Sequence, residues 1–426
     1  MRPPLDGVLV ADFSRVLAGP IATMNLADLG ATVVKVERPG AGDDTRSWGP
    51  PWSDHSSSYF DSINRSKRSV TLDLRDEGDR ALAHELARRA DVFIENFRPG
   101  ALERHGLGYE QVRAANPRIV YASITGFGRG AGADLMGYDF LVQAVGGLMS
   151  VTGEPDGDPT KAGVALVDVL TGKDATIGIL AALTAREHGG QGCRVEVELL
   201  SSLLSSMVNQ AQGYLQTGRA PRRMGNRHPS IAPYETLHCA DGLLAVACGN
   251  DGQFARLATA LGAPELAADE RFATNASRVG HREELVGVLE AQLAAADADT
   301  WQQRLTAADV PAGRVGDLAD GFDLAERLGL EPWSRVDDPA EGWGAGVDPA
   351  EGATRKAGSN GAGGVPQVRH PVRYDADLTT TPSRPPRLGE DDAEVRAWLL
   401  EADPAPLPPA TTRQTGDQEP TRKASR

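Results

Sequence analysis

Short apolar runs alternate with amphipathic stretches along the first 200 residues. Residues 7–14 (GVLVADFS) predict a buried strand, the turn at 18–20 leads into a helix, and residues 31–37 (ATVVKVE) predict a second strand. Further strands are expected at 91–97, 118–128 and 193–200, with helices at 76–90, 171–187 and 201–217. Strands that alternate with helices predict an α/β fold with a mostly parallel, doubly wound sheet.

The pattern changes after residue 231. Two short strand-like runs, ETLHCADG and LLAVACG, precede helical stretches at 252–262 and 281–307, which predicts a second, smaller domain. Residues 339–366 are rich in Gly, Ala and Asp without any period, and we expect a flexible insertion there. The tail at 401–426 is rich in Pro, Thr and charge, which is typical of disorder.

Composition narrows the classes of function. The net charge of −15 argues against a nucleic-acid partner, because binding a phosphate backbone needs a basic surface. No stretch of about 18 apolar residues occurs, and the N-terminus lacks the apolar segment of a signal peptide, so no membrane partner is expected. Three cysteines form no disulfide framework and fit a reducing compartment. We therefore predict a cytoplasmic protein.

Nucleotide and metal motifs are incomplete. The βαβ unit at 7–37 ends in Glu37, where a dinucleotide fold places its ribose-binding acid, but the loop SRVLAGP lacks the glycine fingerprint. The segment GFGRGAG (126–132) lacks the third glycine, so NAD(P) binding stays only an alternative. His228, His238, Cys239 and Cys248 match no zinc spacing, and no metal site is predicted.

Asp168 is the only acid between Gly163 and Lys173, in an otherwise apolar run. An aspartate there is costly to bury unless it is hydrogen-bonded or functional. One interpretation is a cap for the helix expected from about residue 170. The other is a desolvated carboxylate nucleophile that attacks an activated carbonyl. Asp174, inside the expected helix, reads as a solvated or paired acid.

Two further groups could bind an anionic substrate. Arginine and lysine side chains concentrate near the ends of the first predicted strands, where a pyrophosphate would lie. This basic cluster comprises Arg15, Arg38, Arg46, Arg65, Lys67, Arg68, Arg98 and Arg104. The loop GNDGQ (249–253) follows a strand and reads either as a plain turn or as a mobile lid with backbone N–H donors.

Taken together, several long segments resemble the class III CoA-transferases, the CaiB/BaiF or formyl-CoA transferase-like family. The matching pieces include VADFSRVLAGPIAT, ADLGATVVKVERPGAGDDTR, DVFIENFRPGALERHGLGYEQVRAANPRIVYASITGFG, the Asp168 segment and GNRHPSIAPYETLHCADG. They run in family order from residue 7 to about residue 316, with a weaker match at 385–391.

The resemblance implies a Rossmann-like large domain that takes in both ends of the chain, a smaller α+β domain and an interlocked homodimer. The expected boundaries are a first part of the large domain at 1–205, a linker at 206–225, the small domain at 226–325 and a return to the large domain at 326–400.

The resemblance also implies residue roles. Asp168 matches the nucleophile, which forms an aspartyl anhydride and then an aspartyl-CoA thioester while CoA moves from an acyl-CoA to a free carboxylic acid. No tightly bound cofactor is expected, because CoA is a substrate. The family's CoA contacts fall on Val16, Ala18, Arg38, Leu72, Asn96, Phe97 and Arg104, and Arg15 of the basic cluster is expected to join them. The family's glycine loop falls on Gly249, Gly252 and Gln253.

Two departures from the family pattern are Leu17 and the loop GNDGQ, which is less purely glycine than in formyl-CoA transferase, and Tyr138 bears on the choice between two activities. Leu17 stands where formyl-CoA transferase has a glutamine that hydrogen-bonds the nucleophile, which argues against formyl or oxalyl substrates and makes the expected pocket more apolar. In the related α-methylacyl-CoA racemases a histidine partners the aspartate as acid and base, and Tyr138 stands at that position here. Because a phenol ionises near pH ~10, tyrosine favours CoA transfer over proton exchange. A racemase-like enzyme, another acyl-CoA-processing activity and a non-catalytic binding protein remain alternatives.

Overall fold

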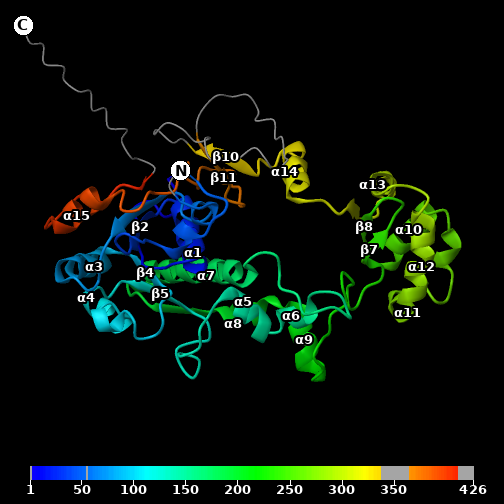
Figure 1. Ribbon diagram of the computed structural model, residues 1–426, viewed down its shortest axis with the longest axis horizontal. Helices are drawn as coiled ribbons and strands as arrows, with labels where there is room; N and C mark the ends of the chain where they lie inside the picture. Colours follow the sequence, from blue (N-terminus) through cyan, green and yellow to red (C-terminus); the bar gives the residue numbers. More distant parts are fainter. Residues whose placement is uncertain (1, 54–55, 337–363, 411–426) are drawn as a thin grey trace, which may run out of the picture. The chain divides into compact units, whose positions relative to one another are not determined.

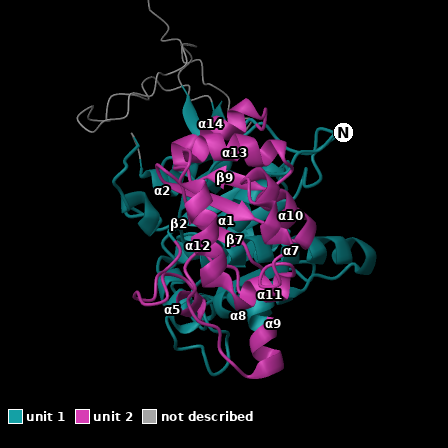
Figure 2. Ribbon diagram, turned by 90° about the vertical axis from the view of Figure 1, so that its right-hand side faces the viewer, with its two compact units in different colours: residues 1–146, 163–211, 331–426 teal, residues 147–162, 212–330 magenta. Residues whose placement is uncertain are grey.

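The structure, a computed structural model, describes residues 2–53, 56–336 and 364–410. The chain forms two compact units (Figure 2). The first comprises residues 1–146, 163–211 and 331–426, and the second comprises residues 147–162 and 212–330. The insertion expected at 339–366 and the tail expected at 401–426 lie mostly outside the described residues, although β11 begins at Val365.

A six-stranded parallel sheet forms the centre of the first unit (Figure 1). Its strands are β1 (Leu9–Asp12), β2 (Thr32–Glu37), β3 (Lys67–Thr71), β4 (Val92–Glu95), β5 (Val120–Thr125) and β6 (Arg194–Glu198). The strand order is β3-β2-β1-β4-β5-β6, so the order reverses between β1 and β4. In such sheets ligands bind at this reversal, beyond the carboxyl ends of the strands. The predicted α/β class and parallel sheet are confirmed.

Helices line the sheet. The longer ones in this unit are α1 (Ala18–Asp28), α3 (Glu77–Arg89), α4 (Tyr109–Ala115), α5 (Asp139–Val145), α7 (Leu166–Gly189), α8 (Leu199–Ser206) and α15 (Asp392–Leu400). Shorter helical turns are η1 (Asp44–Ser47), α2 (Ser58–Asp61) and η2 (Glu103–His105), and β10 (Trp333–Val336) pairs antiparallel with β11 (Val365–Val368).

The alternation of side chains along β1 assigns the two faces. Leu9, Ala11 and Phe13 pack into the core cluster that contains α3, α4 and α15 residues. Asp12 points the opposite way and accepts a hydrogen bond from Thr23 of α1. Because strand side chains alternate in direction, α1 covers the face opposite to α3 and α15.

Gly172 allows α7 to lie directly against the start of α1. A Cβ atom there would meet the Ala18 carbonyl oxygen at 2.7 Å and Ile21 Cβ at 2.9 Å. The close approach requires glycine and brings the first turn of α7, one turn earlier, beside the loop that follows β1.

The end of the chain braces the edge strand β3. The buried Arg68 guanidinium bonds Asp391 at 3.0 Å and Glu394 at 2.8 Å. Asp392 Oδ1 accepts the N–H of Thr71, and its Oδ2 accepts the Thr71 hydroxyl, both at 2.6 Å. Acids more than 300 residues away in sequence thus neutralise and hold β3.

The second unit is built on a three-stranded antiparallel sheet of order β7-β8-β9. Its strands are β7 (Tyr234–His238), β8 (Leu243–Ala247) and β9 (Ala312–Arg314), and its helices are α6 (Leu148–Val151), α10 (Asp251–Ala260), η3 (Pro264–Ala267), α11 (Asn275–Gly280), α12 (Arg282–Leu293), α13 (Ala298–Ala307) and α14 (Leu318–Arg327). Helix α9 (Val208–Thr217) crosses the boundary between the units. The second unit has its own hydrophobic core, which contains Leu237, Phe254, Leu289 and Trp301.

Three helix predictions need correction. Helix α7 begins at Leu166, five residues before the expected start. The stretch at 281–307 forms two helices, because Asp297 caps a new helix. The stretch at 201–217 is likewise divided between α8 and α9. Within the described residues, none of the helices is both long and apolar enough to span a membrane.

Candidate active site

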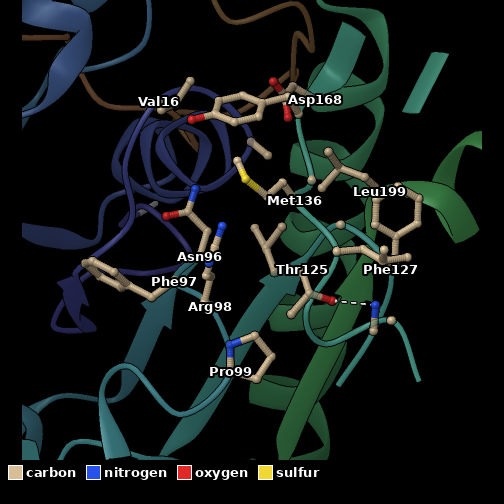
Figure 3. Close-up of a pocket in the computed structure, with 18 of the residues that line it drawn as sticks. Val16, Asn96, Phe97, Arg98, Pro99, Thr125, Phe127, Met136, Asp168 and Leu199 are labelled. Atoms are coloured by element: carbon tan, nitrogen blue, oxygen red, sulfur yellow. Dashed lines mark hydrogen bonds between the residues drawn. The ribbon is translucent and has the colours of Figure 1, made fainter. Parts of the chain in front are cut away.

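A cavity opens at the carboxyl ends of β1, β4 and β5 (Figure 3). Residues 15–18 follow β1, residues 96–99 follow β4, and residues 124–128 include the end of β5. Three further parts complete its wall: Asp168 of α7, Leu199 at the start of α8, and residues 132–133 and 135–138 of the loop that follows β5. The cavity therefore lies at the reversal of strand order, where the fold predicts a ligand.

A second cavity adjoins the first. Arg38, Leu72 and Arg75 contribute to its wall, and Arg15 and Phe97 line both cavities. The Arg15 guanidinium lies 4.8 Å from the centre of the Phe97 ring. Its Nε is buried and has no hydrogen-bond partner among the described residues. A second nitrogen of the guanidinium, Nη1, contacts Asp44 at 3.4 Å. The two cavities thus meet at a cation, which suits an elongated anionic ligand.

Asp168 lies in the first turn of α7, and its side chain reaches the first cavity. The residue that caps α7 is Ala165, so the capping interpretation of Asp168 is wrong. Among the described residues, no hydrogen bond or ion pair reaches the Asp168 carboxylate. Burial, and then the nearby charge of Asp139, raise the pKa of Asp168 to about 7. A desolvated carboxylate without partners fits a nucleophile.

Asp139 provides the missing cap of α7. Its Oδ1 accepts the backbone N–H of Val167 at 2.7 Å and that of Asp168 at 3.3 Å, and its Oδ2 accepts Gln143 Nε2 at 2.7 Å. This residue was absent from the sequence prediction. The acid directly after Tyr138 was the available signal, but a cap that lies 28 residues upstream has no local sequence pattern.

Tyr138 lines the same cavity as Asp168. It lies at the N-cap position of α5, with its neighbour Gly137 packed against Gly126. A Cβ on either glycine would come within 2.4 Å of the other's Cα, so only glycine permits this approach of the two loops. Tyr59, which no sequence motif indicated, also lies near Asp168: its pKa is raised to about 12 by burial and then by the Asp168 charge.

Leu17 lines the cavity and packs in an apolar cluster. Its buried neighbours are Ile21 and Ile63, and the partly buried Val169 of α7 packs against them. The pocket beside Asp168 is therefore apolar on this side, in keeping with the expectation from the sequence.

The residues predicted to contact CoA are distributed over three places. Val16, Ala18, Asn96 and Phe97 line the first cavity, Arg38 and Leu72 line the second, and Arg104 lines neither. The Asn96 amide is engaged by the backbone of Arg15, since it accepts that residue's N–H at 2.8 Å and donates to its carbonyl at 2.7 Å. Arg98, which the sequence placed only in the basic cluster, lines the cavity with Asp168.

Six cations of the basic cluster have carboxylate partners: Arg15 and Arg38 pair with Asp44 on a more exposed part of the protein, and four others form buried ion pairs. Arg65 pairs with Asp28, Lys67 with Asp12, Arg68 with Asp391 and Arg46 with Glu37, and all four cations are buried or nearly so. The expectation that the cluster as a whole faces an anion is wrong for these four, because their charges are neutralised inside the protein. Arg15, Arg38 and Arg98 lie at the cavities.

Gly249, Gly252 and Gln253 belong to the second unit, where they surround the start of α10. Asn250 caps this helix by accepting the N–H of Gln253 at 2.9 Å, and Gln253 Oε1 accepts the N–H of Gly249 at 2.7 Å. Within the described residues, no group of three or more His, Cys, Asp or Glu side chains is arranged to hold a metal ion.

Comparison with known proteins decides the family. The sequence matches CoA-transferase family III over residues 5–392. The chain belongs to this family. It is 42% identical to a succinate–glutarate CoA-transferase of Agrobacterium fabrum over 93% of this chain and 96% of that protein. It is 43% identical to an acetyl-CoA:oxalate CoA-transferase of Acetobacter aceti over 76% of this chain and 84% of that protein.

A solved structure supports the same assignment. A CaiB/BaiF family protein from Brucella suis superposes with a TM-score of 0.79 at 42% identity, covering 94% of this chain and all of that one. The predicted family and enzyme class are therefore confirmed: the chain is a CoA-transferase, and its substrates are CoA thioesters.

Proposed function

We propose that this enzyme moves CoA from an acyl-CoA thioester to a free carboxylic acid through covalent intermediates on Asp168. The observation that carries the proposal is the position of Asp168. Its carboxylate reaches a cavity at the reversal of strand order and has no hydrogen-bond partner among the described residues. A carboxylate without internal partners is free to attack an electrophilic carbonyl.

The reaction proceeds through four successive acyl-transfer steps. The Asp168 carboxylate attacks the donor thioester carbonyl, the carbon–sulfur bond breaks, and CoA thiolate leaves behind a mixed anhydride. The thiolate attacks the aspartyl carbonyl and releases the donor acid, which gives an aspartyl-CoA thioester. The acceptor carboxylate then displaces the thiolate to form a second anhydride. Attack of the thiolate on the acceptor carbonyl forms the new acyl-CoA and restores Asp168. Covalent catalysis divides one difficult exchange into easier steps.

The two cavities suit the parts of an elongated CoA thioester. The first contains Asp168 and Tyr138, and the second contains Arg38 and Leu72. Arg15, at their junction, has a half-buried guanidinium that also contacts Asp44 and would bond a CoA phosphate, with Val16, Ala18, Asn96 and Phe97 beside it. In this proposal Arg104 contacts CoA from outside the two cavities, and Gly249, Gly252 and Gln253 form the family's glycine loop.

The relatives suggest the class of acid. Their names specify succinate and glutarate in one case and oxalate in the other, all dicarboxylates. Arg98 lines the cavity of Asp168 and could pair with a second carboxylate. We therefore propose a dicarboxylic acid as acceptor.

A homodimer in the cytoplasm is the proposed state. Large apolar side chains are exposed on three neighbouring helices of the first unit: Phe140 of α5 at 60%, Ile177 of α7 at 65% and Leu204 of α8 at 48%. An exposed apolar surface of this kind marks an interaction site. Three free cysteines fit a reducing compartment.

Trapping the intermediate tests the proposal. We expect incubation with succinyl-CoA followed by hydroxylamine or borohydride to modify the peptide that contains Asp168, as detected by mass spectrometry. Asp168→Asn should lose both the adduct and CoA exchange. Asp174→Asn is the matched control, because Asp174 lies in the same helix but is exposed. An adduct that survives Asp168→Asn, or CoA exchange without Asp168, refutes the mechanism.

A further inference from the structure

The loop after β1 contains a backbone conformation that its residue disfavours. Val16 has a φ of 68°, in the left-handed region where glycine is usual. For a β-branched side chain this conformation is strained and persists only when its surroundings enforce it. Val16 lies in the wall of the first cavity, next to Arg15 at the junction with the second. Whatever enforces its conformation also shapes the proposed CoA site.

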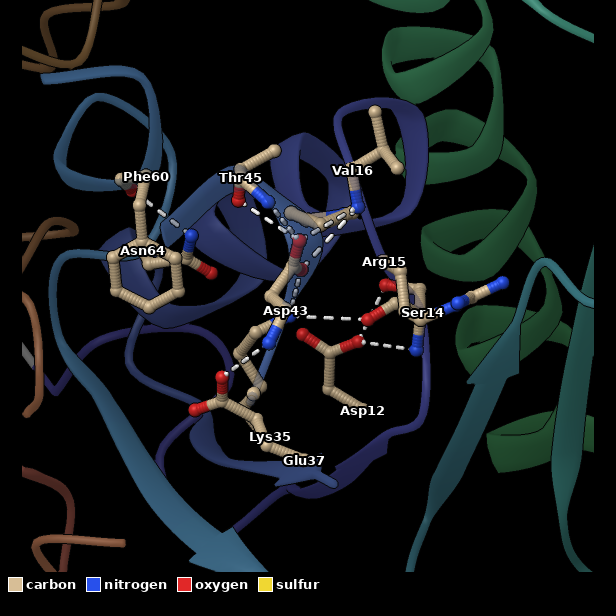
Figure 4. Close-up of polar contacts among 12 residues, drawn as sticks. Asp12, Ser14, Arg15, Val16, Lys35, Glu37, Asp43, Thr45, Phe60 and Asn64 are labelled. Atoms are coloured by element: carbon tan, nitrogen blue, oxygen red, sulfur yellow. Dashed lines mark hydrogen bonds and ion pairs between the residues drawn. The ribbon is translucent and has the colours of Figure 1, made fainter. Parts of the chain in front are cut away.

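Side chains from outside the loop hold its backbone (Figure 4). Both oxygens of Asp43 accept the N–H of Val16, at 3.3 and 3.2 Å. Lys35 Nζ donates to the carbonyl of Ser14 at 3.0 Å, and Asp12 accepts the N–H of Ser14 at the same distance. Of these contacts, only those from Asp43 reach the strained residue itself.

Asp43 and Lys35 form an ion pair at the floor of the second cavity. Their charged atoms are 2.9 Å apart, and both side chains are fully inaccessible to solvent. Burial alone would raise the pKa of Asp43, but the Lys35 charge and hydrogen bonds from Lys35 and Thr45 outweigh it and hold the pKa at about 2. The carboxylate is therefore charged at neutral pH, and a charged acceptor makes the stronger hydrogen bond to Val16.

We propose that the buried Asp43–Lys35 pair is a positioning device that holds Val16 in its left-handed conformation and so sets the cavity wall on which CoA binds. The inference rests on the proposed function only for the identity of the ligand. Asp43 is a positioning residue, since its inaccessible side chain acts through Val16. A buried ion pair is by itself weak grounds for a role in stability, and the bond to Val16 gives this pair a specific task.

Asp43→Asn tests the inference while nearly preserving the side-chain volume. We expect about a tenfold rise in the KM for succinyl-CoA and in the Kd for CoA measured by titration calorimetry, with kcat changed by less than about twofold. Asp28→Asn is the matched control, because Asp28 forms a buried ion pair with Arg65 and has no hydrogen bond or ion pair to the loop at 14–18. It should lower thermal stability without changing KM or Kd.

A second substitution separates positioning from a general loss of structure. Glycine adopts the left-handed conformation without strain, so in the Val16→Gly background the effect of Asp43→Asn on Kd should shrink to about twofold or less. An equal effect in both backgrounds overturns the inference, as does a loss confined to kcat. If Asp43→Asn does not fold, Thr45→Val removes one donor to the same carboxylate, 2.8 Å away, and should give a smaller rise in Kd. An unchanged Kd in Thr45→Val would then count against the role.

The calorimetric measurement keeps this inference separable from the proposed function. If the wild-type protein binds CoA but transfers it to no acid, the proposed reaction is refuted. The Kd values of the variants then still decide whether Asp43 has a positioning role. Exchange activity with a Kd unaffected by Asp43→Asn refutes the positioning role alone.

Discussion

The carboxylate of Asp139 accepts the backbone N–H of Asp168 at 3.3 Å, so one acid begins the helix that carries the other. The contact places a second negative charge beside the proposed nucleophile. After burial, this charge is the second cause of the raised pKa of Asp168. The same residue thus fixes the position of Asp168 and opposes its ionisation.

The pH dependence of transfer should follow Asp168. Because the nucleophile must be ionised, we expect kcat/KM to increase with pH up to about 7, the raised pKa, and to level off above it. Asp139→Asn removes a neighbouring negative charge, which makes ionisation easier and moves the inflection to lower pH by less than about one unit, since burial is the larger cause. An inflection that stays in place or moves upward in this variant contradicts the assignment.

Asp168→Asn should stabilise the protein above neutral pH. The pKa of Asp168 in the folded state, about 7, lies above the ordinary value of 3.8. The folded state therefore loses the stability contributed by the protonated carboxyl group as pH rises between these two values, and this one contribution is gone above about 7. The amide cannot ionise, and we expect a gain of about 1–3 kcal/mol in the free energy of unfolding at about pH 8, and little gain at about pH 4. Thermal unfolding of both proteins at the two pH values measures this difference. If Asp168→Asn is less stable than wild type at the higher pH, the charge of Asp168 does not destabilise the folded protein.

Arg15 should contribute more to CoA affinity than arginines that lie away from the two cavities. Since its guanidinium lies where the two cavities meet, we expect Arg15→Ala to raise the KM for acyl-CoA by about 10- to 100-fold, as for a lost hydrogen bond to a charged group. Arg113→Ala, an exposed change on α4, is the control. Arg104→Ala tests the remaining predicted contact: a KM like that of the control would remove Arg104 from the site.

Transfer should occur without exchange of the α-proton. We expect no deuterium from heavy water in the product acyl-CoA, because Asp168 acts as a nucleophile and Tyr138 is a poor acid–base partner. Mass spectrometry of a 2-methylacyl-CoA incubated without any acceptor acid provides the measurement. Incorporation of deuterium would favour the racemase-like alternative.

Self-association can be measured directly. The exposed apolar side chains on α5, α7 and α8 predict a particle of twice the 45.0 kDa chain mass in analytical ultracentrifugation. Phe140→Asp should weaken the association, whereas a substitution at the polar, exposed Lys173 of α7 should not. A 45.0 kDa particle at every concentration would refute the dimer.

Five of the six strands of the parallel sheet were predictable because buried strands have a strong local signal, whereas β3, with the sequence KRSVT, was missed. Each apolar run read as a strand in the first 200 residues contains one, from Leu9–Asp12 to Arg194–Glu198. The start of α7 was missed because its cap, Asp139, comes from a different helix. The sequence shows local periodicity, whereas contacts of this kind exist only after folding.

The candidate site was predictable to a smaller degree. Asp168 was found as a lone acid in an apolar run and through the family resemblance, and it lies in a cavity with Tyr138 and Arg15. The basic cluster was overestimated, because the partner of Arg68 is Asp391, 323 positions away. Composition gives no indication of which charges are neutralised by distant partners. Lys35 and Asp43 were missed for the same reason, since a buried lysine in a strand cannot be distinguished from an exposed one.

The bracing of β3 by Asp391 and Asp392 has a consequence for biosynthesis. The ribosome releases the six strands of the parallel sheet within the first 198 residues, but the acids that neutralise Arg68 and hold Thr71 emerge only near the end of 426 residues. Until then β3 has a cation without its native counter-charge at the sheet edge, and unprotected edges invite pairing with other chains. A nascent chain stalled before residue 391 should therefore recruit chaperones at β3, while the second unit, complete by residue 330, already has its own core.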